Sequence, residues 1–179
     1  MTEAIVSLRK VRLSYLDEFE EAFQSRDGAS EHQWFGFWNS AGARTALAER
    51  HLLGGDANML AVTIDDQLAG RVEWIRTAWG RPNTSSCWEI ALGILPAHRG
   101  RGIGTEAQRQ LTDYLFTHYP IQRVQVTTAA ENIAEQRCLE KLGFTREGII
   151  RDAQWRDGAW HDQWIYSMLR HEWTITHQA

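Results

Sequence analysis

The feature that most constrains this fold is a strand-like segment that runs through a turn of glycine and arginine into an amphipathic helix. Ser85–Leu95 is rich in apolar residues and predicts a strand. Arg99-Gly100-Arg101-Gly102-Ile103-Gly104 follows, and Gly104–His118 carries apolar residues at helical spacing. Glycine is costly to order, so its density at this junction indicates a backbone that a ligand approaches closely.

The ligand that this junction favours is a phosphate, because a helix N-terminus presents N–H groups and partial positive charge. Arg99 and Arg101 can add charge-assisted contacts. A Walker A loop would end in Gly-Lys-Ser/Thr, and the lysine is missing here. A dinucleotide fingerprint reads GxGxxG, whereas this turn reads GxGxG. A third pattern, Arg/Gln-x-x-Gly-x-Gly/Ala, is filled by Arg99, Gly102 and Gly104. The alternative is a solvated loop.

Periodicity predicts eleven elements in the order β-α-α-β-β-β-α-β-α-β-β, a mixed α/β (α+β) fold. No linker or repeat interrupts residues 1–179, so we expect a single domain. The predicted strands are Ala4–Arg9, Asn58–Ile64, Leu68–Thr77, Ser85–Leu95, Arg123–Ala129, Thr145–Trp155 and Trp160–Arg170. The predicted helices are Tyr15–Gln24, Ala41–Leu53, Gly104–His118 and Asn132–Leu142.

Composition excludes several classes of function. A net charge of −4 gives no basic field for nucleic acid or an anionic membrane. No apolar run is long enough to span a bilayer, and MTEAIVSLRK has no signal-peptide core. Cys87 and Cys138 are too few for a disulfide framework, and the histidines show no metal-ligand spacing. We therefore expect a cytoplasmic protein without a metal.

Three segments in order resemble the GNAT superfamily of N-acetyltransferases, and within it the Rim-type branch that acetylates amino termini of ribosomal proteins. They are WEIALGILPAHRGRGIGTEA, ENIAEQRCLEKLGFTREG and DGAWHDQWIYSMLRHEW. The resemblance implies a twisted mixed sheet of about seven strands flanked by about four helices. It also implies that acetyl-CoA supplies the phosphate.

By this resemblance, backbone N–H groups of the turn hold the coenzyme A pyrophosphate, and the strand before it pairs with the pantetheine arm. One N–H of that strand would polarise the thioester carbonyl. Asn132 would reach the pantetheine or the phosphate, or it caps its own helix, and both roles can hold together. The implied cofactor-binding residues are Leu92, Ile94, Arg99, Gly100, Arg101, Gly102, Ile103, Gly104, Thr105 and Asn132.

The chemistry implied is direct attack of an amine on the thioester in a ternary complex, with Glu89 as the candidate general base. The alternative for Glu89 is a solvated or arginine-paired carboxylate. Many GNAT enzymes have a tyrosine acid where this chain has Leu139, and Rim-type relatives have a serine where it has Glu135. The thiolate would then take its proton from solvent. Cys138 beside this position is expected to be a buried apolar residue.

The acceptor side is predicted from an aromatic segment in a connection, EHQWFGFWNS. Trp34, Phe35, Phe37 and Trp38 would form an aromatic wall for an apolar or planar acceptor. The alternative is a hydrophobic plug over the sheet or a homodimer contact. The acceptor would be a small-molecule or peptide amine. The competing functions are a non-catalytic acyl-CoA sensor and a transferase that uses another acyl-CoA.

Overall fold

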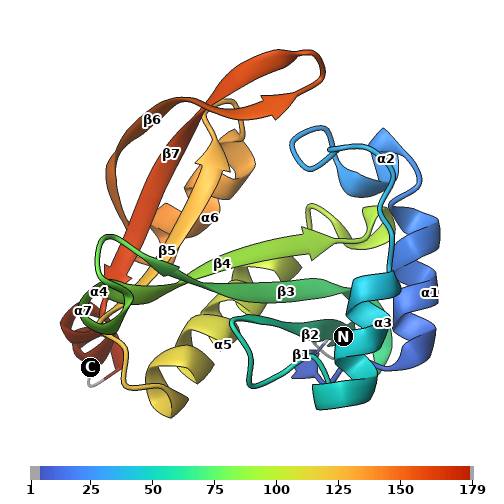
Figure 1. Cartoon of the computed structure of the whole chain (residues 1–179), viewed down its shortest axis with the longest axis horizontal. Coiled ribbons are helices and arrows are strands. Elements are labelled where there is room, and N and C mark those ends of the chain that lie inside the picture. The colour runs from blue at the N-terminus through green and yellow to red at the C-terminus, as the bar shows by residue number, and fades with distance from the viewer. Residues whose placement is uncertain (1–4, 178–179) are drawn as a thin grey trace. The chain divides into compact units, whose positions relative to one another are not determined.

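The computed structural model of the chain describes residues 5–177 (Figure 1). The chain divides into two compact units. The first unit comprises the residues up to Glu73 together with Leu92–Gln110. The second comprises Trp74–Ala91 together with the residues from Leu111 onward. The prediction of a single domain over residues 1–179 stays a prediction.

A seven-stranded mixed sheet has the strand order β1-β2-β3-β4-β5-β7-β6. β1 pairs antiparallel with β2, β4 pairs parallel with β5, and β7 pairs antiparallel with both β5 and β6. This confirms the predicted mixed α/β class. The strands are β1 Val6–Arg9, β2 Ala57–Ile64, β3 Gln67–Ala78, β4 Ser86–Ile94, β5 Arg123–Ala129, β6 Thr145–Arg156 and β7 Ala159–Leu169.

Within residues 5–177 the structure has seven α-helices where the sequence predicts about four. The predicted helices correspond to α1 Leu13–Ala22, α3 Ala41–Arg50, α5 Ile103–His118 and α6 Ile133–Lys141. The additional helices are the short α2 Arg26–Ala29 and α4 Pro82–Ser85, and the terminal α7 Arg170–His177. Every predicted strand is present, although Ala4 of the first one lies outside the described residues.

Two tight turns fix the registers of their hairpins. Asp65 and Asp66 have φ of 49° and 65°, and they join β2 to β3. Asp157 and Gly158 have φ of 53° and 79°, and they join β6 to β7 at the predicted Asp-Gly turn. Two residues with positive φ match the right-handed twist of the paired strands. The terminal hairpin is therefore confirmed.

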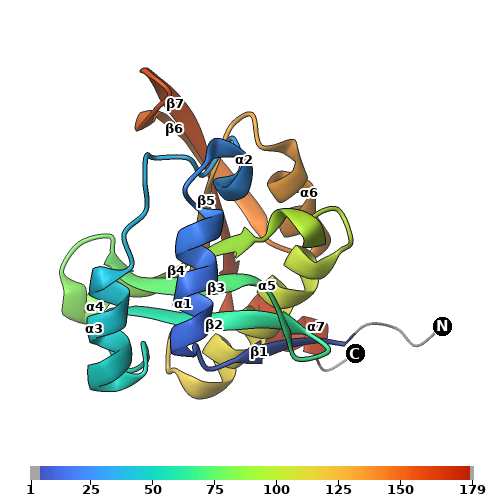
Figure 2. The ribbon, with the colours of Figure 1, turned by 90° about the vertical axis from the view of Figure 1, so that its right-hand side faces the viewer.

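The core of the first unit forms where α1 packs on β2 and β3. Leu16 and Phe19 are fully buried, and Phe23 stacks on Phe19 with ring centroids 5.9 Å apart. These side chains join Ala61 and Leu68 in one apolar cluster. Figure 2 shows α1 crossing over β2. The i, i+3, i+7 spacing of the helix residues supplies the buried stripe.

The core of the second unit includes the end of α5 and the start of α7. The Arg170 guanidinium donates to the carbonyls of Phe116, Tyr119 and Ile121 at 2.9, 2.6 and 2.7 Å. Trp173 stacks on Phe116 with ring centroids 5.4 Å apart. Carbonyls at a helix C-terminus lack intrahelical partners, so a cation that binds them fixes where the chain turns back.

Candidate active site

The glycine and arginine turn connects β4 to α5 through a short 3₁₀ helix, η1 (Pro96–His98). Gly100 and Gly102 have φ of +70° and +77°. A Cβ added at either glycine would meet nothing within 4 Å. The backbone conformation, and not a shortage of space, therefore explains both glycines. Alternation of left-handed glycine with ordinary residues turns successive N–H groups to one side, an arrangement that suits an anion.

Gly104 is required for a different reason, which is close packing in the first unit. A Cβ at Gly104 would lie 2.9 Å from Leu92 Cδ2 and 3.7 Å from Ile94 Cγ1. The first turn of α5 thus lies directly against the end of β4. Ile103 is buried there, and the carbonyl of Gly102 accepts the N–H of Glu106 at 3.1 Å. The positive end of the helix dipole therefore lies at the turn.

Arg99 and Arg101 lie in different environments. Arg99 Nε donates to the carbonyl of Ile94 at 2.8 Å, and its two Nη atoms donate to the carbonyls of Asp27 and Gly28. Burial lowers the pKa of Arg99 from its ordinary value, and the charge of Asp27 opposes that change. Arg101 is exposed. The Arg99 side chain therefore ties α2 to the turn, and its role as a phosphate ligand stays a prediction.

The aromatic segment 34–38 lies in a connection, as the sequence predicts, and its four rings are not equivalent. Phe35 and Phe37 are 55% and 79% exposed, so most of the surface of these two rings is not packed against the rest of the chain. Trp34 packs edge-on against Phe37 with centroids 5.7 Å apart. Trp38 is half-buried and packs edge-on against Phe23, at 6.0 Å. Their part in acceptor binding, like the homodimer alternative, stays a prediction.

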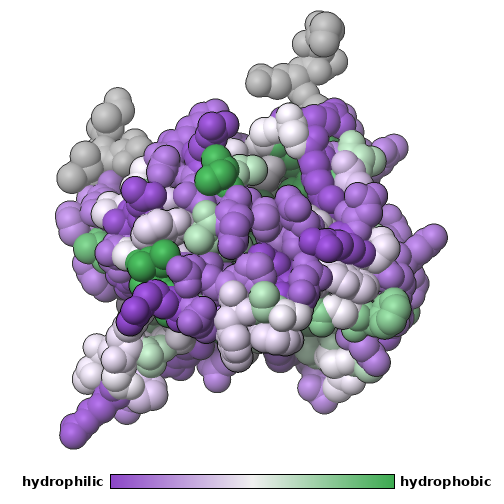
Figure 3. Space-filling model, turned by 90° about the horizontal axis from the view of Figure 1, so that it is seen from above, coloured by the Kyte–Doolittle hydropathy of each residue, from purple (hydrophilic) through white to green (hydrophobic). Residues whose placement is uncertain are grey.

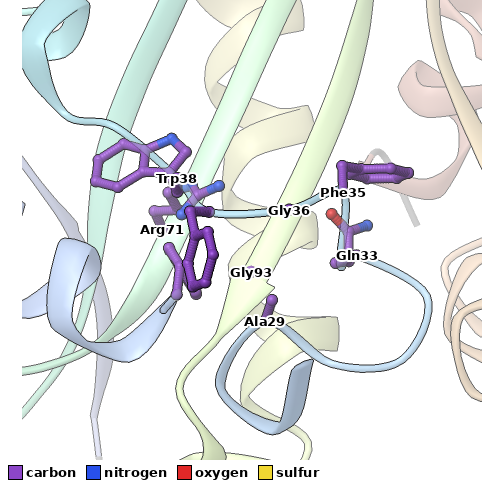
Figure 4. A pocket seen from close by; sticks show the side chains of 9 residues that line it. Ala29, Gln33, Phe35, Gly36, Trp38, Arg71 and Gly93 are labelled. Carbon is purple, nitrogen blue, oxygen red and sulfur yellow. The ribbon is translucent and has the colours of Figure 1, made fainter. Parts of the chain in front are cut away.

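A cavity of about 180 Å³ lies beside this segment in the first unit (Figure 4). One lining residue, Arg71, was not predicted as a functional candidate, because a single charged residue in a strand belongs to no recognisable motif. The lining includes Phe35, Phe37, Trp38, Phe23, Arg71 and Gly93. Gly93 separates Leu92 from Ile94, so the cavity adjoins the stretch of β4 for which a pantetheine contact is predicted.

Glu89 lies in the second unit, where β4 pairs with β5. The register sets Glu89 opposite Gln125, and Thr127 is two residues farther along the same face of β5. Thr127 Oγ1 donates to Glu89 Oε1 at 2.6 Å, and Gln125 Nε2 donates to Glu89 Oε2 at 3.0 Å. The carboxylate is half-buried, and these two contacts fix its orientation. The side-chain partners that the structure shows for Glu89 are therefore Thr127 and Gln125, and its role as general base stays a prediction.

The hydrogen bonds of Gln125 orient its side-chain amide so that Nε2 donates to Glu89. Its Oε1 accepts from Trp79 Nε1 at 2.8 Å, Arg123 Nε at 3.1 Å and Cys87 Sγ at 3.4 Å. Because these three donors occupy the oxygen, the amide nitrogen faces the carboxylate. Burial raises the pKa of the Cys87 thiol, so Cys87 is poorly suited to act as a nucleophile. Gln125 is a positioning residue that sequence spacing did not reveal.

The residues around α6 match part of the prediction. Asn132 Oδ1 accepts the N–H of Glu135 at 3.2 Å, which confirms that Asn132 caps α6. Its contact with the cofactor stays a prediction. Leu139, at the position of the tyrosine acid in many relatives, is fully buried. Cys138 is half-buried rather than buried, because only one face of α6 packs on the sheet.

Two further observations come from the described part of the chain. Residues 5–177 contain no group of three or more histidine, cysteine, aspartate or glutamate side chains that could hold a metal ion. In the same range, no helix combines the length and apolar character needed to cross a membrane. The face drawn in Figure 3 is mainly hydrophilic, with its apolar side chains in small separate groups.

Comparison with known proteins identifies the kind of domain that carries this turn. Residues 6–145 match the family model described as an acetyltransferase (GNAT) domain. YjcK of Bacillus subtilis, named as a probable N-acetyltransferase, is 34% identical over 105 residues, which are 59% of this chain and 56% of YjcK. YdaF of the same organism, named provisionally as a ribosomal N-acetyltransferase, is 36% identical over 85 residues, or 48% and 46% of the two chains.

The alignments therefore span about half the length of these curated relatives. A solved structure of spermidine N-acetyltransferase from Vibrio cholerae, in complex with CoA and spermine, superposes with a TM-score of 0.78. It is 20% identical and covers 94% of this chain and 98% of that one. At that identity the likeness establishes the fold.

Proposed function

This chain belongs to the GNAT acetyltransferase family, and from that premise we propose that it transfers the acetyl group of acetyl-CoA to an amine. The observation that carries the proposal is the turn before α5. Gly100 and Gly102 take left-handed conformations with open space beside them, and Gly104 lets the helix lie on β4. Together with the helix dipole, this backbone suits the diphosphate of coenzyme A.

The proposed cofactor-binding residues suit coenzyme A both in their chemistry and in their order along the chain. We assign the pyrophosphate to the backbone of Arg101, Gly102, Ile103, Gly104 and Thr105. We assign the pantetheine arm to Leu92 and Ile94, with Asn132 beside it. When bound, acetyl-CoA supplies an activated acyl group as a thioester. Arg99 supports the turn through its carbonyl contacts, and its additional contact with phosphate stays a prediction.

Glu89 is the general base in this proposal. A carboxylate has about four acceptor sites, and Thr127 and Gln125 use two of them. The remaining sites can accept the amine proton, directly or through one water. The two donors hold the carboxylate in one orientation, which reduces the reorganisation needed when the proton moves.

The reaction balances without a protein acid. The amine nitrogen forms a bond to the acetyl carbon, the carbon–sulfur bond breaks, and Glu89 takes the amine proton. The leaving thiolate takes a proton from water, since Leu139 is apolar and buried. The products are an amide and a free thiol. We place this reaction in the cytoplasm, where the thiols of Cys87 and Cys138, which form no disulfide, stay reduced.

The acceptor is a protein α-amine or a small-molecule amine. YdaF is named for ribosomal proteins and the Vibrio cholerae enzyme for spermidine, so relatives of this fold differ in their named acceptors. The likeness to YdaF favours a Rim-type acceptor for this chain. The exposed rings of Phe35 and Phe37 beside the cavity support acceptor binding there.

The test is thiol release from acetyl-CoA with a panel of amines and short peptides, with mass spectrometry of the products. The proposal expects amine-dependent thiol release and a product heavier by one acetyl group. Stabilisation by acetyl-CoA without turnover of any amine would favour the non-catalytic sensor, which the buried Leu139 permits. Faster turnover with a longer acyl-CoA would instead favour a transferase of another acyl group.

A further inference from the structure

The cavity beside the aromatic segment contains a cation as well as rings. The Arg71 side chain is only 15% exposed. Its guanidinium carbon lies 4.3 Å from the ring centroid of Phe23 and 5.6 Å from that of Trp38. Figure 4 shows Arg71 and Trp38 on one side of the cavity, with Phe35 and Gln33 on the other. The rings hold the guanidinium in place by cation–π contact and by packing.

The hydrogen bonds of this guanidinium are incomplete. Among the described residues, Nε and Nη1 of Arg71 are buried and have no hydrogen-bond partner. Nε lies 3.3 Å from Glu73 Oε1, which is ion-pair distance without hydrogen-bond geometry. A buried cation with unused donors is costly, so the site favours any group that supplies acceptor oxygens.

The space beside Arg71 limits what that group can be. The volume of about 180 Å³ is below the ~300–1,000 Å³ of a pocket that encloses a whole drug-sized ligand. It therefore admits one part of an acceptor. Aromatic walls favour an apolar or planar body, and the forked guanidinium favours a carboxylate. A second ammonium group, as in a polyamine, would be repelled by Arg71.

The cavity also lies next to the β4 residues that we assign to the pantetheine arm, which is where an acceptor would have to bind. Gly93, which lines the cavity, lies between Leu92 and Ile94, the two β4 residues that we assign to the pantetheine arm. A Cβ at Gly93 would lie 3.8 Å from both Arg71 Cγ and Phe23 Cζ, so the cavity opens directly above this strand.

We propose that this cavity binds a carboxylate that belongs to the same molecule as the acceptor amine, with Arg71 pairing the carboxylate and the rings contacting an apolar body. The inference rests on the proposed function, and it narrows the acceptor to amines that carry a carboxylate. Two sources have this chemistry, a free amino acid and a peptide with an acidic residue close to its amino terminus.

Binding of an unreactive pair of probes tests the inference without any turnover. N-acetyl-phenylalanine carries the carboxylate, N-acetyl-phenylalaninamide lacks it, and neither offers an amine to acetylate. Calorimetric titration of the full chain should give at least about tenfold tighter binding of the acid than of the amide, as expected for a charge-assisted hydrogen bond. An N-acetylated dipeptide amide that begins with aspartate, paired with its asparagine form, tests the peptide source.

Variants of Arg71 test whether this side chain causes the preference for the acid over the amide. Arg71→Met should remove the difference between acid and amide, and Arg71→Lys should retain part of it, because lysine keeps the charge without the fork. Arg12→Met is the matched control, since Arg12 also lies over a ring, that of Tyr15 at 5.6 Å, but is exposed at the N-cap position just before α1. It should leave the preference intact. Circular dichroism checks each fold.

Equal binding of acid and amide to the wild-type chain, no binding of either probe, or a preference that survives in Arg71→Met would each overturn the inference. These outcomes are independent of the acetyl-transfer assay. Turnover of carboxylate-free amines without any acid preference would support the proposed function while contradicting the assignment of Arg71. Should Arg71→Met unfold, the wild-type preference and Arg71→Lys still decide the question.

Discussion

Single side chains carry the proposed chemistry, and Glu89 carries most of it. Replacing Glu89 by Gln keeps the size and one acceptor oxygen but removes the ability to take a proton. We expect kcat to fall by about 100-fold or more, which is the usual contribution of a general base. The affinity for acetyl-CoA should not change, because Glu89 and the turn belong to different segments.

Thiol-release kinetics and calorimetric titration of acetyl-CoA measure the two effects separately. Glu21→Gln, the same change at an exposed residue of α1, is the matched control. A Glu89→Gln variant with wild-type kcat would remove Glu89 from the role of base.

The sequence reveals only some of the residues around Glu89. Glu89 itself could be found because it lies on the strand before a recognisable turn. Gln125 and Thr127 could not, since their contacts with Glu89 depend on the pairing register of β4 and β5. Arg71 was missed for a similar reason, because its environment is created by rings from α1 and from the 34–38 segment.

The turn between β4 and α5 is the element that we propose for cofactor binding. Gly102→Ala places a Cβ at φ +77°, which costs about 1–2 kcal/mol of stability, and it alters the N–H groups that face the pyrophosphate. We expect acetyl-CoA binding to weaken by about tenfold or more, the loss of a charge-assisted contact.

Gly54→Ala provides the matched control, because Gly54 has φ +79° and equally open space but lies after α3. It should lose similar stability and keep its acetyl-CoA affinity. Titration calorimetry on both variants makes the comparison, and an equal loss of affinity in both would argue against the turn as the binding element.

One carboxylate connects three strands of the second unit. Arg123 of β5 donates twice to Glu147 of β6, at 2.6 Å each, and Ser167 of β7 donates to the same carboxylate at 2.7 Å. The hydrogen bonds from Arg123 lower the pKa of Glu147, and those from Ser167 add to the effect. Because the pKa of Glu147 is lower in the folded protein than in the unfolded chain, its carboxylate stabilises the fold fully at a pH above the unfolded-state pKa. This stabilisation is lost as the pH falls through the folded-state pKa.

Glu147→Gln should therefore reduce stability at pH 7 and reduce it less as the pH falls below about 4.3, the ordinary glutamate pKa. Glu147 is 39% exposed, so the loss at pH 7 should be no more than about 1 kcal/mol. Thermal unfolding between pH 7 and pH 3 measures it, with Glu18→Gln on α1 as the control. A deficit that grows toward acid pH would contradict this linkage.

Long, periodic elements are predictable from this sequence, and short or contact-dependent ones are not. α5 and β5 were located because amphipathic spacing and β-rich composition extend over many residues. α2 and α4, with four residues each, are too short to show a period. α7 was not predicted, because the predicted strand ends at Arg170. The helix begins there, where the Arg170 side chain contacts the carbonyls of Phe116, Tyr119 and Ile121.

Across the whole chain the net charge is −4, although we propose a local site for an anion at the turn. The net charge gives no long-range field that attracts anions, so the proposed phosphate site depends on backbone geometry and one helix dipole. The family was expected from the resemblance of three ordered segments, whereas no segment of the sequence predicts the Arg71 cation beside the cavity.

We propose that the turn at Arg99–Gly104 holds the pyrophosphate of acetyl-CoA, and thermal unfolding tests this contact most directly. Acetyl-CoA at roughly 100 times its Kd should raise the Tm by about 5–10 °C for a chain of this size. Acetyl-pantetheine, which has the same thioester but lacks the pyrophosphate, should raise the Tm far less at the same concentration. Equal shifts from the two compounds, or no shift from acetyl-CoA, would show that this turn does not hold the pyrophosphate.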